Sequence, residues 1–410
     1  MDFYQQGPTT LHDLHPDRRG HARSLLVKHA PDRPAALVLP MLMSEMDRPA
    51  LAGIRDGLAK ADFLQEIVVA LTANDEADVE RCRRFFSDLP TNVSVLWCEG
   101  PAVNETLASL ADKGFDLRGF SGKGLAVWLA LGVASEDNYA IALHDADIDF
   151  YDPKILHRLL LPIVVPEMDF FFAKGYYARL TDERMYGRVT RLFLWPFLDA
   201  LDICLGAASP MLRYMRSFRY PLSGEMSMTG DLARNIRIPT DWGLEMSVLG
   251  EVHRSASMKR ICQVDLGTYS HKHNPVGTNR DEGLQRMALD IATSVYRLLA
   301  SMEGQRITHD LLTTLQVAYR REAQDAIRKY AMDSLANGLT YDRHEEELIV
   351  ERLEPVLRDA GHLFMQQPSK DLIGEWLRAL SADPDAPSRM RPPPVGARAK
   401  LTEAARMDSA

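Results

Sequence analysis

Residues 139–148 read Tyr-Ala-Ile-Ala-Leu-His-Asp-Ala-Asp-Ile, an apolar run followed by two acidic residues, Asp145 and Asp147. A continuous apolar run of about 4–8 residues is typical of a strand buried on both faces. Two carboxylates at positions i and i+2 after such a strand can point into one crevice. They repel each other unless a cation lies nearby, and hard carboxylate oxygens suit Mg²⁺ or Mn²⁺. The alternative is a solvated acidic turn, because the DxD pattern is short.

Three further apolar runs precede this stretch and alternate with helical patterns. These predicted strands cover residues 35–40, 66–71 and 93–97. The predicted helices cover residues 50–61, 75–89 and 124–133. Such alternation is typical of an α/β fold with a mostly parallel, Rossmann-type sheet sandwiched by helices. Ligands of these sheets bind beyond the carboxyl ends of the strands, so the segments after each strand are candidate binding loops.

The remaining chain suggests four parts. Residues 1–33 are polar, with four histidines and three prolines, and are expected to form an extended arm or loose cap. Residues 34–280 form the expected catalytic domain, with a donor half (34–150) and an acceptor half (151–280). Residues 281–380 carry amphipathic helical patterns over 283–302, 309–336 and 342–360. Residues 381–410 are rich in proline and charge, so they are expected to be disordered and dispensable.

Composition and charge exclude several classes of protein. The net charge of -9 gives no electrostatic support to non-specific nucleic-acid binding. No apolar stretch reaches the roughly 18 residues of a membrane span, and the polar N-terminus does not resemble a signal peptide. The four cysteines are widely spaced, which favours buried thiols over structural zinc or a disulfide framework. A cytoplasmic protein without nucleic-acid or membrane partners is expected.

A glycine-flanked lysine, Lys123, lies in Phe-Ser-Gly-Lys-Gly at residues 120–124, just before a predicted helix. The segment is not a Walker A loop, because it lacks the first glycine and the final Ser or Thr. Glycines at a helix start still allow close backbone approach to an anion. Lys123 could then neutralise a diphosphate. The alternative is a flexible surface turn.

His271 and His273 belong to the segment Tyr-Ser-His-Lys-His-Asn-Pro at residues 269–275. Without a neighbouring cysteine or third histidine, structural zinc is improbable. A single neutral imidazole that completes a carboxylate–metal–diphosphate site is more plausible, and a polar loop is the alternative.

Three other segments are weak signals when taken singly. Residues 187–190, Gly-Arg-Val-Thr, combine a guanidinium, a hydroxyl and backbone donors that suit a phosphate or carboxylate. Residues 221–225 (Pro-Leu-Ser-Gly-Glu) and 242–245 (Trp-Gly-Leu-Glu) each place a glutamate close to a glycine. Buried glutamates beside open backbone can bind sugar hydroxyls.

Together these segments follow the order seen in retaining glucosyl-3-phosphoglycerate synthases of the GT-A fold, which the chain resembles over about residues 35–280. The resemblance implies glucose transfer from UDP-glucose to 3-phosphoglycerate, a divalent metal (Mg²⁺ or Mn²⁺) and a homodimer that takes part in compatible-solute synthesis. The metal ligands implied are Asp147 and His271, and the catalytic residues implied are Lys123, Asp147 and Glu245.

The resemblance also assigns the two substrates to particular residues. The implied donor-binding residues are Pro40, Met41, Leu42, Ser44, Glu45, Thr72, Lys123, Asp145, Ala146, Asp147, Leu222 and Glu245. The implied acceptor-binding residues are Gly187, Arg188, Val189, Thr190 and His273, with residues 187–190 expected in a loop.

The chain departs from the family pattern at three points. The first donor loop, residues 40–45, is one residue longer, and the turn after residue 71 lacks the usual serines. Tyr269 stands where the family usually has an arginine. GDP-mannose as donor or glycerate as acceptor therefore stay open. A sugar nucleotidyltransferase is disfavoured because no glycine-rich signature follows the first strand, and a non-catalytic sugar-nucleotide-binding protein because both Asp147 and His271 are present.

Overall fold

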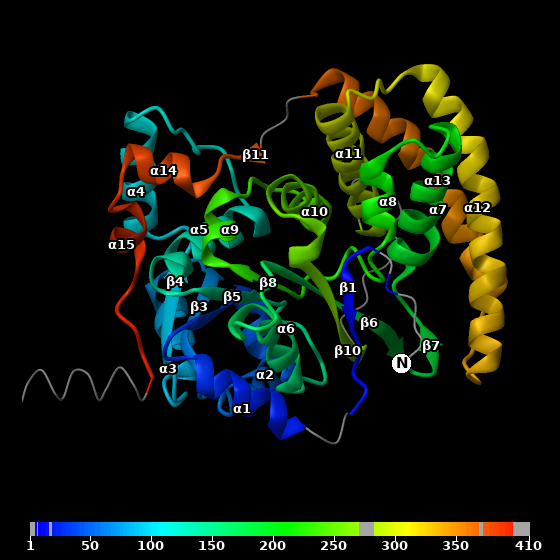
Figure 1. Cartoon of the computed structure of the whole chain (residues 1–410). Coiled ribbons are helices and arrows are strands. Elements are labelled where there is room, and N and C mark those ends of the chain that lie inside the picture. Colours follow the sequence, from blue (N-terminus) through cyan, green and yellow to red (C-terminus); the bar gives the residue numbers. More distant parts are fainter. Residues whose placement is uncertain (1–4, 6, 16–18, 270–282, 369–371, 397–410) are drawn as a thin grey trace, which may run out of the picture.

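A nine-stranded sheet lies at the centre of the computed structural model, which describes residues 5, 7–15, 19–269, 283–368 and 372–396 (Figure 1). The strand order is β1-β10-β6-β8-β5-β2-β3-β4, and β7 pairs with β6 outside that path. The strands are β1 (Thr9–Leu11), β2 (Ala35–Leu42), β3 (Leu64–Thr72), β4 (Asn92–Trp97), β5 (Ala140–Leu143), β6 (Phe172–Thr181), β7 (Arg184–Met185), β8 (Met226–Thr229) and β10 (Ile261–Tyr269). A separate antiparallel pair joins β9 (Ile238–Pro239) to β11 (Leu372–Ile373).

The sheet is mostly parallel, as the sequence predicts. The four predicted strands are β2, β3, β4 and β5, and they pair in parallel with one another. Within the main path, β8 is the antiparallel strand, between β5 and β6. Alternate residues of β2 enter two different buried clusters, with Ala36 and Val38 on one face and Leu37 and Leu39 on the other. Both faces of these strands are therefore buried, which explains their continuous apolar sequence.

Helices cover both faces of the sheet. The long apolar helix α5 (Lys123–Asp137) packs on β2 and β3 from one side. On the same side lies α4 (Pro101–Asp112), which the sequence analysis missed. The other face is covered by α2 (Pro49–Leu58), α3 (Glu76–Phe86) and α6 (Lys154–Val164).

The N-terminal segment is not merely an extended arm. Strand β1 adds to the edge of the sheet by parallel pairing with β10, and the Gln263 side-chain amide donates to the Thr10 hydroxyl at 2.9 Å. Residues Arg19–His29 form helix α1, which packs on α6 and buries Leu26. These contacts could not be predicted from the polar composition of residues 1–33, because a short strand or helix can pack on its neighbours with few apolar residues.

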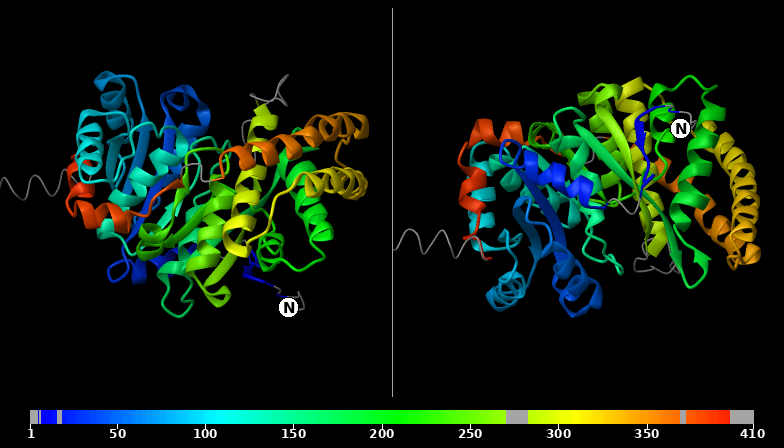
Figure 2. Two further views of the ribbon diagram at one scale, coloured as in Figure 1. Left: turned by 90° about the horizontal axis from the view of Figure 1, so that it is seen from above. Right: turned by 60° about the horizontal axis from the view of Figure 1, so that its bottom comes forward.

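The three long helices expected near the C-terminus are present. They are α11 (Gly283–Glu303), α12 (His309–Ala336) and α13 (Arg343–Gln366). They pack with one another and with α7 (Trp195–Cys204), and one buried cluster runs from the sheet into all three. Figure 2 shows them at the opposite end of the molecule from α15. The smaller helices are η1 (Met43–Asp47), η2 (Val189–Leu194), α8 (Pro210–Arg216), α9 (Gly230–Asn235), α10 (Leu244–Ser255) and η3 (Met258–Arg260).

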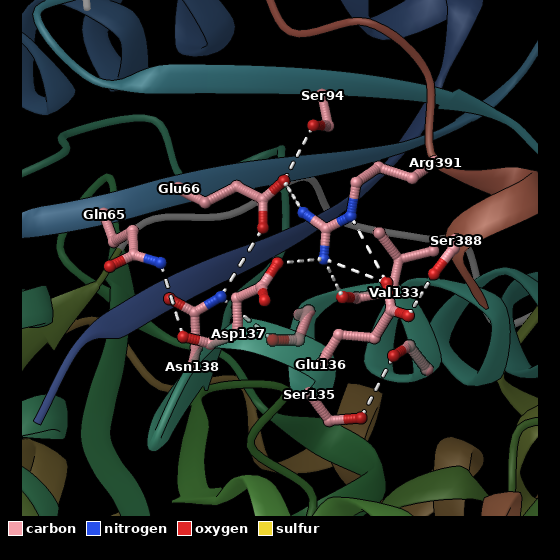
Figure 3. Close-up of polar contacts among 12 residues, drawn as sticks. Gln65, Glu66, Ser94, Val133, Ser135, Glu136, Asp137, Asn138, Ser388 and Arg391 are labelled. Carbon is pink, nitrogen blue, oxygen red and sulfur yellow. Dashed lines mark hydrogen bonds and ion pairs between the residues drawn. The ribbon is translucent and has the colours of Figure 1, made fainter. Parts of the chain in front are cut away.

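The expected disorder from residue 381 was wrong for residues 381–396. After α14 (Trp376–Ala382), helix α15 (Ala386–Met390) packs on α4 and α5, and Val395 forms an antiparallel bridge with Val93 of the edge strand β4. The Arg391 side chain links strand β3 to helix α5 (Figure 3). Its guanidinium donates to Glu66 of β3 at 2.7 Å and to the Val133 carbonyl of α5 at 2.6 Å. We call residues 386–396 the C-terminal strap. Specific ion pairing and backbone pairing order this strap despite its composition.

Two further expectations can be compared with the structure. All four cysteines are free, and Cys82, Cys98 and Cys262 are buried, as expected for thiols in a core. Among the residues that the structure describes, no helix has the length and hydropathy needed to cross a membrane.

Candidate active site

A cavity of about 500 Å³ opens at the carboxyl ends of β2, β3, β5 and β6. This is the edge at which ligands of mostly parallel sheets bind. One wall comes from the loops after these strands, and another comes from residues 186–190. Helix α11, far along the chain, closes the cavity with Leu284, Met287 and Ile291. The C-terminal helical region therefore contributes directly to the cavity.

Most residues of the implied donor set line this cavity. They are Pro40, Met41, Leu42, Glu45, Thr72, Lys123, Asp145, Ala146, Asp147, Leu222 and Glu245. Ser44 differs, because it is exposed on η1 and lies outside the cavity wall. In this short 3₁₀ helix Ser44 is exposed, whereas the next residue, Glu45, lines the cavity.

Lys123 links two carboxylates across the cavity floor. Its ammonium donates to Asp145 Oδ1 at 2.6 Å and lies 3.8 Å from Glu245 Oε1. Desolvation opposes the charge on Lys123, but Asp145, Glu245 and Asp147 together raise its pKa above the ordinary value. Burial raises the pKa of Glu245, against the effect of Lys123 and Lys174. The segments around residues 123, 145 and 245 thus meet in one charged cluster.

The absence of a side chain at Gly224 leaves space for the Asp145 carboxylate. A Cβ atom at Gly224 would lie only 2.6 Å from Asp145 Oδ2, so a larger residue would displace the carboxylate. The preceding carbonyl, that of Ser223, accepts a hydrogen bond at 2.6 Å from the buried Lys174. Burial lowers the pKa of Lys174 to about 8, although Glu245 and Glu225 act in the opposite direction. The Pro-Leu-Ser-Gly-Glu segment therefore supports the acidic motif, and its Glu225 is buried beneath it.

The carboxylates present fit a divalent cation. Asp145 accepts a hydrogen bond from Lys123, and Asp147 lines the same cavity in the loop after β5. His271 and His273 lie outside the described residues. Strand β10 ends two residues before His271, at Tyr269, which pairs in register with the cavity residue Arg179. Among the described residues, no group of three or more His, Cys, Asp or Glu side chains could hold a metal alone. A cation at Asp147 would need ligands from the diphosphate or from the segment after β10.

The expectation of a loop at residues 187–190 was wrong. Gly187 has a positive φ of 74°, and the π-helix η2 begins at Val189, directly after Arg188. The apolar residues that follow are buried, which draws the segment into helical structure against α12. Arg188 itself has helical backbone angles (φ -55°, ψ -40°), yet Arg188 and Thr190 both line the same cavity. Arg188 also lies 3.6 Å from Glu345 of α13.

Several cavity residues were not singled out from the sequence. They are Glu99, Tyr177, Arg179, Tyr186, Tyr220, Trp242 and the three residues of α11. Trp242 belongs to the Trp-Gly-Leu-Glu segment, three residues before Glu245, so the sequence could have indicated that it lines the site. Tyr177 and Arg179 lie in β6 and Tyr186 follows β7, where no motif marks them. Tyr220 lies between α8 and the Pro-Leu-Ser-Gly-Glu segment.

Comparison with known proteins gives a consistent answer. The chain is 45% identical over 387 residues to the glucosyl-3-phosphoglycerate synthase of Methanococcoides burtonii, covering 94% of this chain and 95% of that protein. It belongs to the glucosyl-3-phosphoglycerate synthase family. The family member from Persephonella marina is 40% identical over 394 residues, covering 95% of this chain and 97% of that protein. No protein-family model matches the chain.

Solved structures of the family support the fold. The glucosyl-3-phosphoglycerate synthase of Mycobacterium tuberculosis in complex with phosphoglyceric acid is 22% identical, covering 72% of this chain and 87% of that chain with a TM-score of 0.52. The same family member in complex with Mn²⁺, UDP-glucose and phosphoglyceric acid gives a TM-score of 0.51 at 21% identity, covering 72% of this chain and 86% of that chain. At 21–22% identity, the similarity to these structures shows the GT-A fold alone.

Proposed function

We propose that this protein transfers glucose from UDP-glucose to 3-phosphoglycerate, with retention of the anomeric configuration. Family membership over nearly the whole chain supports this activity. The single structural observation that carries it is one cavity with Lys123, Asp145 and Asp147 on the donor side and Arg188 on the other. The test is incubation with UDP-glucose, Mg²⁺ and 3-phosphoglycerate, followed by measurement of UDP and of the glucosylated product.

The same assay with other substrates examines the departures in the sequence. GDP-mannose replaces UDP-glucose in one arm, and glycerate replaces 3-phosphoglycerate in another. We expect the highest kcat/KM for UDP-glucose with 3-phosphoglycerate. A higher kcat/KM with GDP-mannose or glycerate would move the protein to a related glycosyltransferase activity.

We assign the donor to the sheet side of the cavity. Asp147 and His271 would hold Mg²⁺ or Mn²⁺, which when bound offsets the negative charge of the departing diphosphate. Lys123 adds a second positive charge to the same region. Glu245 accepts hydrogen bonds from glucose hydroxyls beside Lys123. On the opposite wall, residues 187–190 hold the acceptor. We assign His273 to the same substrate from the family resemblance.

The reaction exchanges one bond at the anomeric carbon for another. The bond from C1 of glucose to the diphosphate oxygen breaks, and the hydroxyl oxygen of the acceptor forms the new bond on the same face. The departing phosphate takes the hydroxyl proton. Residues of the two walls hold donor and acceptor against each other, and this positioning supplies much of the rate.

Lys123→Ala is expected to weaken use of the donor. The substitution leaves Asp145 and Glu245 without the ammonium that now lies between them, and it removes a charge-assisted contact to the diphosphate. We expect kcat/KM for UDP-glucose to fall about 10–100-fold, as for the loss of one charged hydrogen bond. Steady-state kinetics at saturating acceptor measure this. If the substitution changed only the affinity for the acceptor, Lys123 would belong to the acceptor site instead.

Arg188→Ala is expected to weaken use of the acceptor. Its guanidinium carries a fixed charge and a planar set of donors that suit a phosphate. We expect the KM for 3-phosphoglycerate to rise about 10–100-fold and the KM for UDP-glucose to change little. The preference for 3-phosphoglycerate over glycerate should shrink as well. A wild-type preference for glycerate that survives the substitution would refute the phosphate assignment but not the transferase activity.

We also propose a homodimer that works in the cytoplasm. Apolar side chains remain exposed on α12, namely Val317, Met332 and Leu335, and these support burial against a second copy. Light scattering of the purified protein distinguishes a monomer from a dimer.

A further inference from the structure

A second arginine, Arg179, lies in the wall of the same cavity and belongs to none of the motifs. It lies near the end of β6, opposite Tyr269 of β10 in the strand register. Its side chain is half-buried. The family usually has an arginine at the position of Tyr269. In this chain the Tyr269 ring stacks on Tyr177, with ring centroids 4.0 Å apart. The neighbouring strand β6 supplies a guanidinium instead, that of Arg179.

The Arg179 side chain lies beside Gly187, the residue that directly precedes Arg188. Arg179 Cδ is 3.8 Å from the point where a Cβ on Gly187 would lie, and the Tyr220 hydroxyl is 3.5 Å from that point. The backbone carbonyl of Arg179 accepts from the Tyr186 amide at 2.8 Å, which ties the two segments together. Arg179, Gly187 and Arg188 all line the cavity, so one ligand in it can contact both arginines.

The two arginines have different electrostatic surroundings. Burial opposes the charge of Arg179, but Tyr220, Tyr177 and Asp147 together raise its pKa. Burial lowers the pKa of Arg188, and the carboxylates that act on it are Glu345 and Glu346 of α13. In the structure, Arg179 lies on the sheet, near the end of β6, whereas Arg188 lies 3.6 Å from Glu345 of α13.

3-Phosphoglycerate carries an anion on each side of its hydroxyl group. The carboxylate is bonded directly to the carbon that bears the hydroxyl, whereas the phosphate is attached through an additional carbon and oxygen. Since the hydroxyl must face the sugar held beside Asp147 and Lys123, the carboxylate lies close to that region and the phosphate reaches farther away. Two separate cations in one cavity, one on the sheet and one beside α13, match this arrangement.

We propose that Arg179 is the second anion-binding residue of the acceptor site and binds the acceptor carboxylate, while Arg188 binds the phosphate. This assignment rests on the proposed function. It gives the site a way to recognise both ends of the acceptor: one arginine distinguishes 3-phosphoglycerate from glycerol 3-phosphate, and the other distinguishes it from glycerate.

The test compares three acceptors in wild type, Arg179→Gln, Arg179→Lys and Arg188→Gln. We expect Arg179→Gln to raise the KM for 3-phosphoglycerate about 10–100-fold and to remove the preference over glycerol 3-phosphate. Its preference over glycerate should remain, and Arg179→Lys should restore part of the lost affinity. Arg188→Gln should show the opposite pattern. The matched control is Arg219→Gln, an exposed arginine outside the cavity wall that stacks on Tyr176.

Melting temperature and the KM for UDP-glucose are measured for each variant and should stay close to wild type. If Arg179→Gln leaves the choice between 3-phosphoglycerate and glycerol 3-phosphate unchanged, or mainly raises the KM for UDP-glucose, the carboxylate assignment is wrong and the transferase activity stands. If the wild type does not use 3-phosphoglycerate at all, the proposed function fails and the assignment fails with it.

Discussion

Asp147→Ala is expected to lower turnover by on the order of 1000-fold, because a bound cation supplies several kcal/mol of charge stabilisation and each 1.4 kcal/mol is a factor of ten. The carboxylate lines the cavity and is not part of either apolar cluster, so the fold should survive. Addition of EDTA to the wild type should produce a similar loss, and Mg²⁺ or Mn²⁺ should restore the activity. Turnover and melting temperature are measured together.

Asp149→Ala is the matched control for this prediction. Asp149 lies two residues farther along the same loop, is exposed and is not part of the cavity wall. Its replacement removes the same charge and should leave turnover within about twofold of wild type, as for surface substitutions. Full activity of Asp147→Ala in the presence of EDTA would contradict the proposed metal site at Asp147.

Arg391→Ala is expected to destabilise the whole fold. Glu66 is only 4% exposed, and besides Arg391 its carboxylate accepts hydrogen bonds from the Ser94 hydroxyl and the Asn138 amide. Loss of Arg391 leaves that buried charge without its cation. Breaking such a pair from one side costs about 3–5 kcal/mol, and partial exposure of Arg391 reduces our expectation to about 2–4 kcal/mol of unfolding free energy. Deletion of residues 384–410 should cost more, since it also removes the Val93–Val395 bridge.

Urea unfolding measures both effects as a shift of the midpoint. Arg343→Ala provides the control, because this exposed arginine pairs with Glu347 on the surface of α13 and should change stability by less than about 0.5 kcal/mol. Glu66→Gln combined with Arg391→Ala should recover part of the loss, since the unpaired charge is then removed. An unchanged midpoint for Arg391→Ala would mean that the strap contributes nothing to stability.

The parts of the fold that the sequence predicted are those with local patterns. The strands at residues 35–40 and 67–71 are apolar because both faces are buried, and the helix at residues 309–336 has a clear period. The acidic motif could be placed at the cavity because a parallel sheet fixes where its strands end. The ordered series of motifs then indicated the family.

The parts that escaped prediction depend on contacts between distant residues. Glu66 and Arg391 are 325 residues apart, and neither residue alone suggests an ion pair. Trp376 stacks on Trp128 at 3.9 Å and fills the space that Gly132 leaves open, so its burial depends on a helix met much earlier in the chain. Arg179 reaches the cavity because strand register places it there. The helix at Val189 follows from burial against α12, which outweighs the local Gly-Arg-Val-Thr pattern.

The C-terminal strap has a consequence for how the protein is made. The ribosome synthesises β2, β3, β4 and α5 early, yet Glu66 acquires its cationic partner from residue 391, and Val93 of β4 acquires its bridge from residue 395. The donor half of the sheet therefore cannot complete its folding before the C-terminal strap has been synthesised. Until the last residues leave the ribosome, β4 has an open edge that can pair with another chain. Protection of nascent chains by chaperones should matter more for this protein than its final compactness suggests.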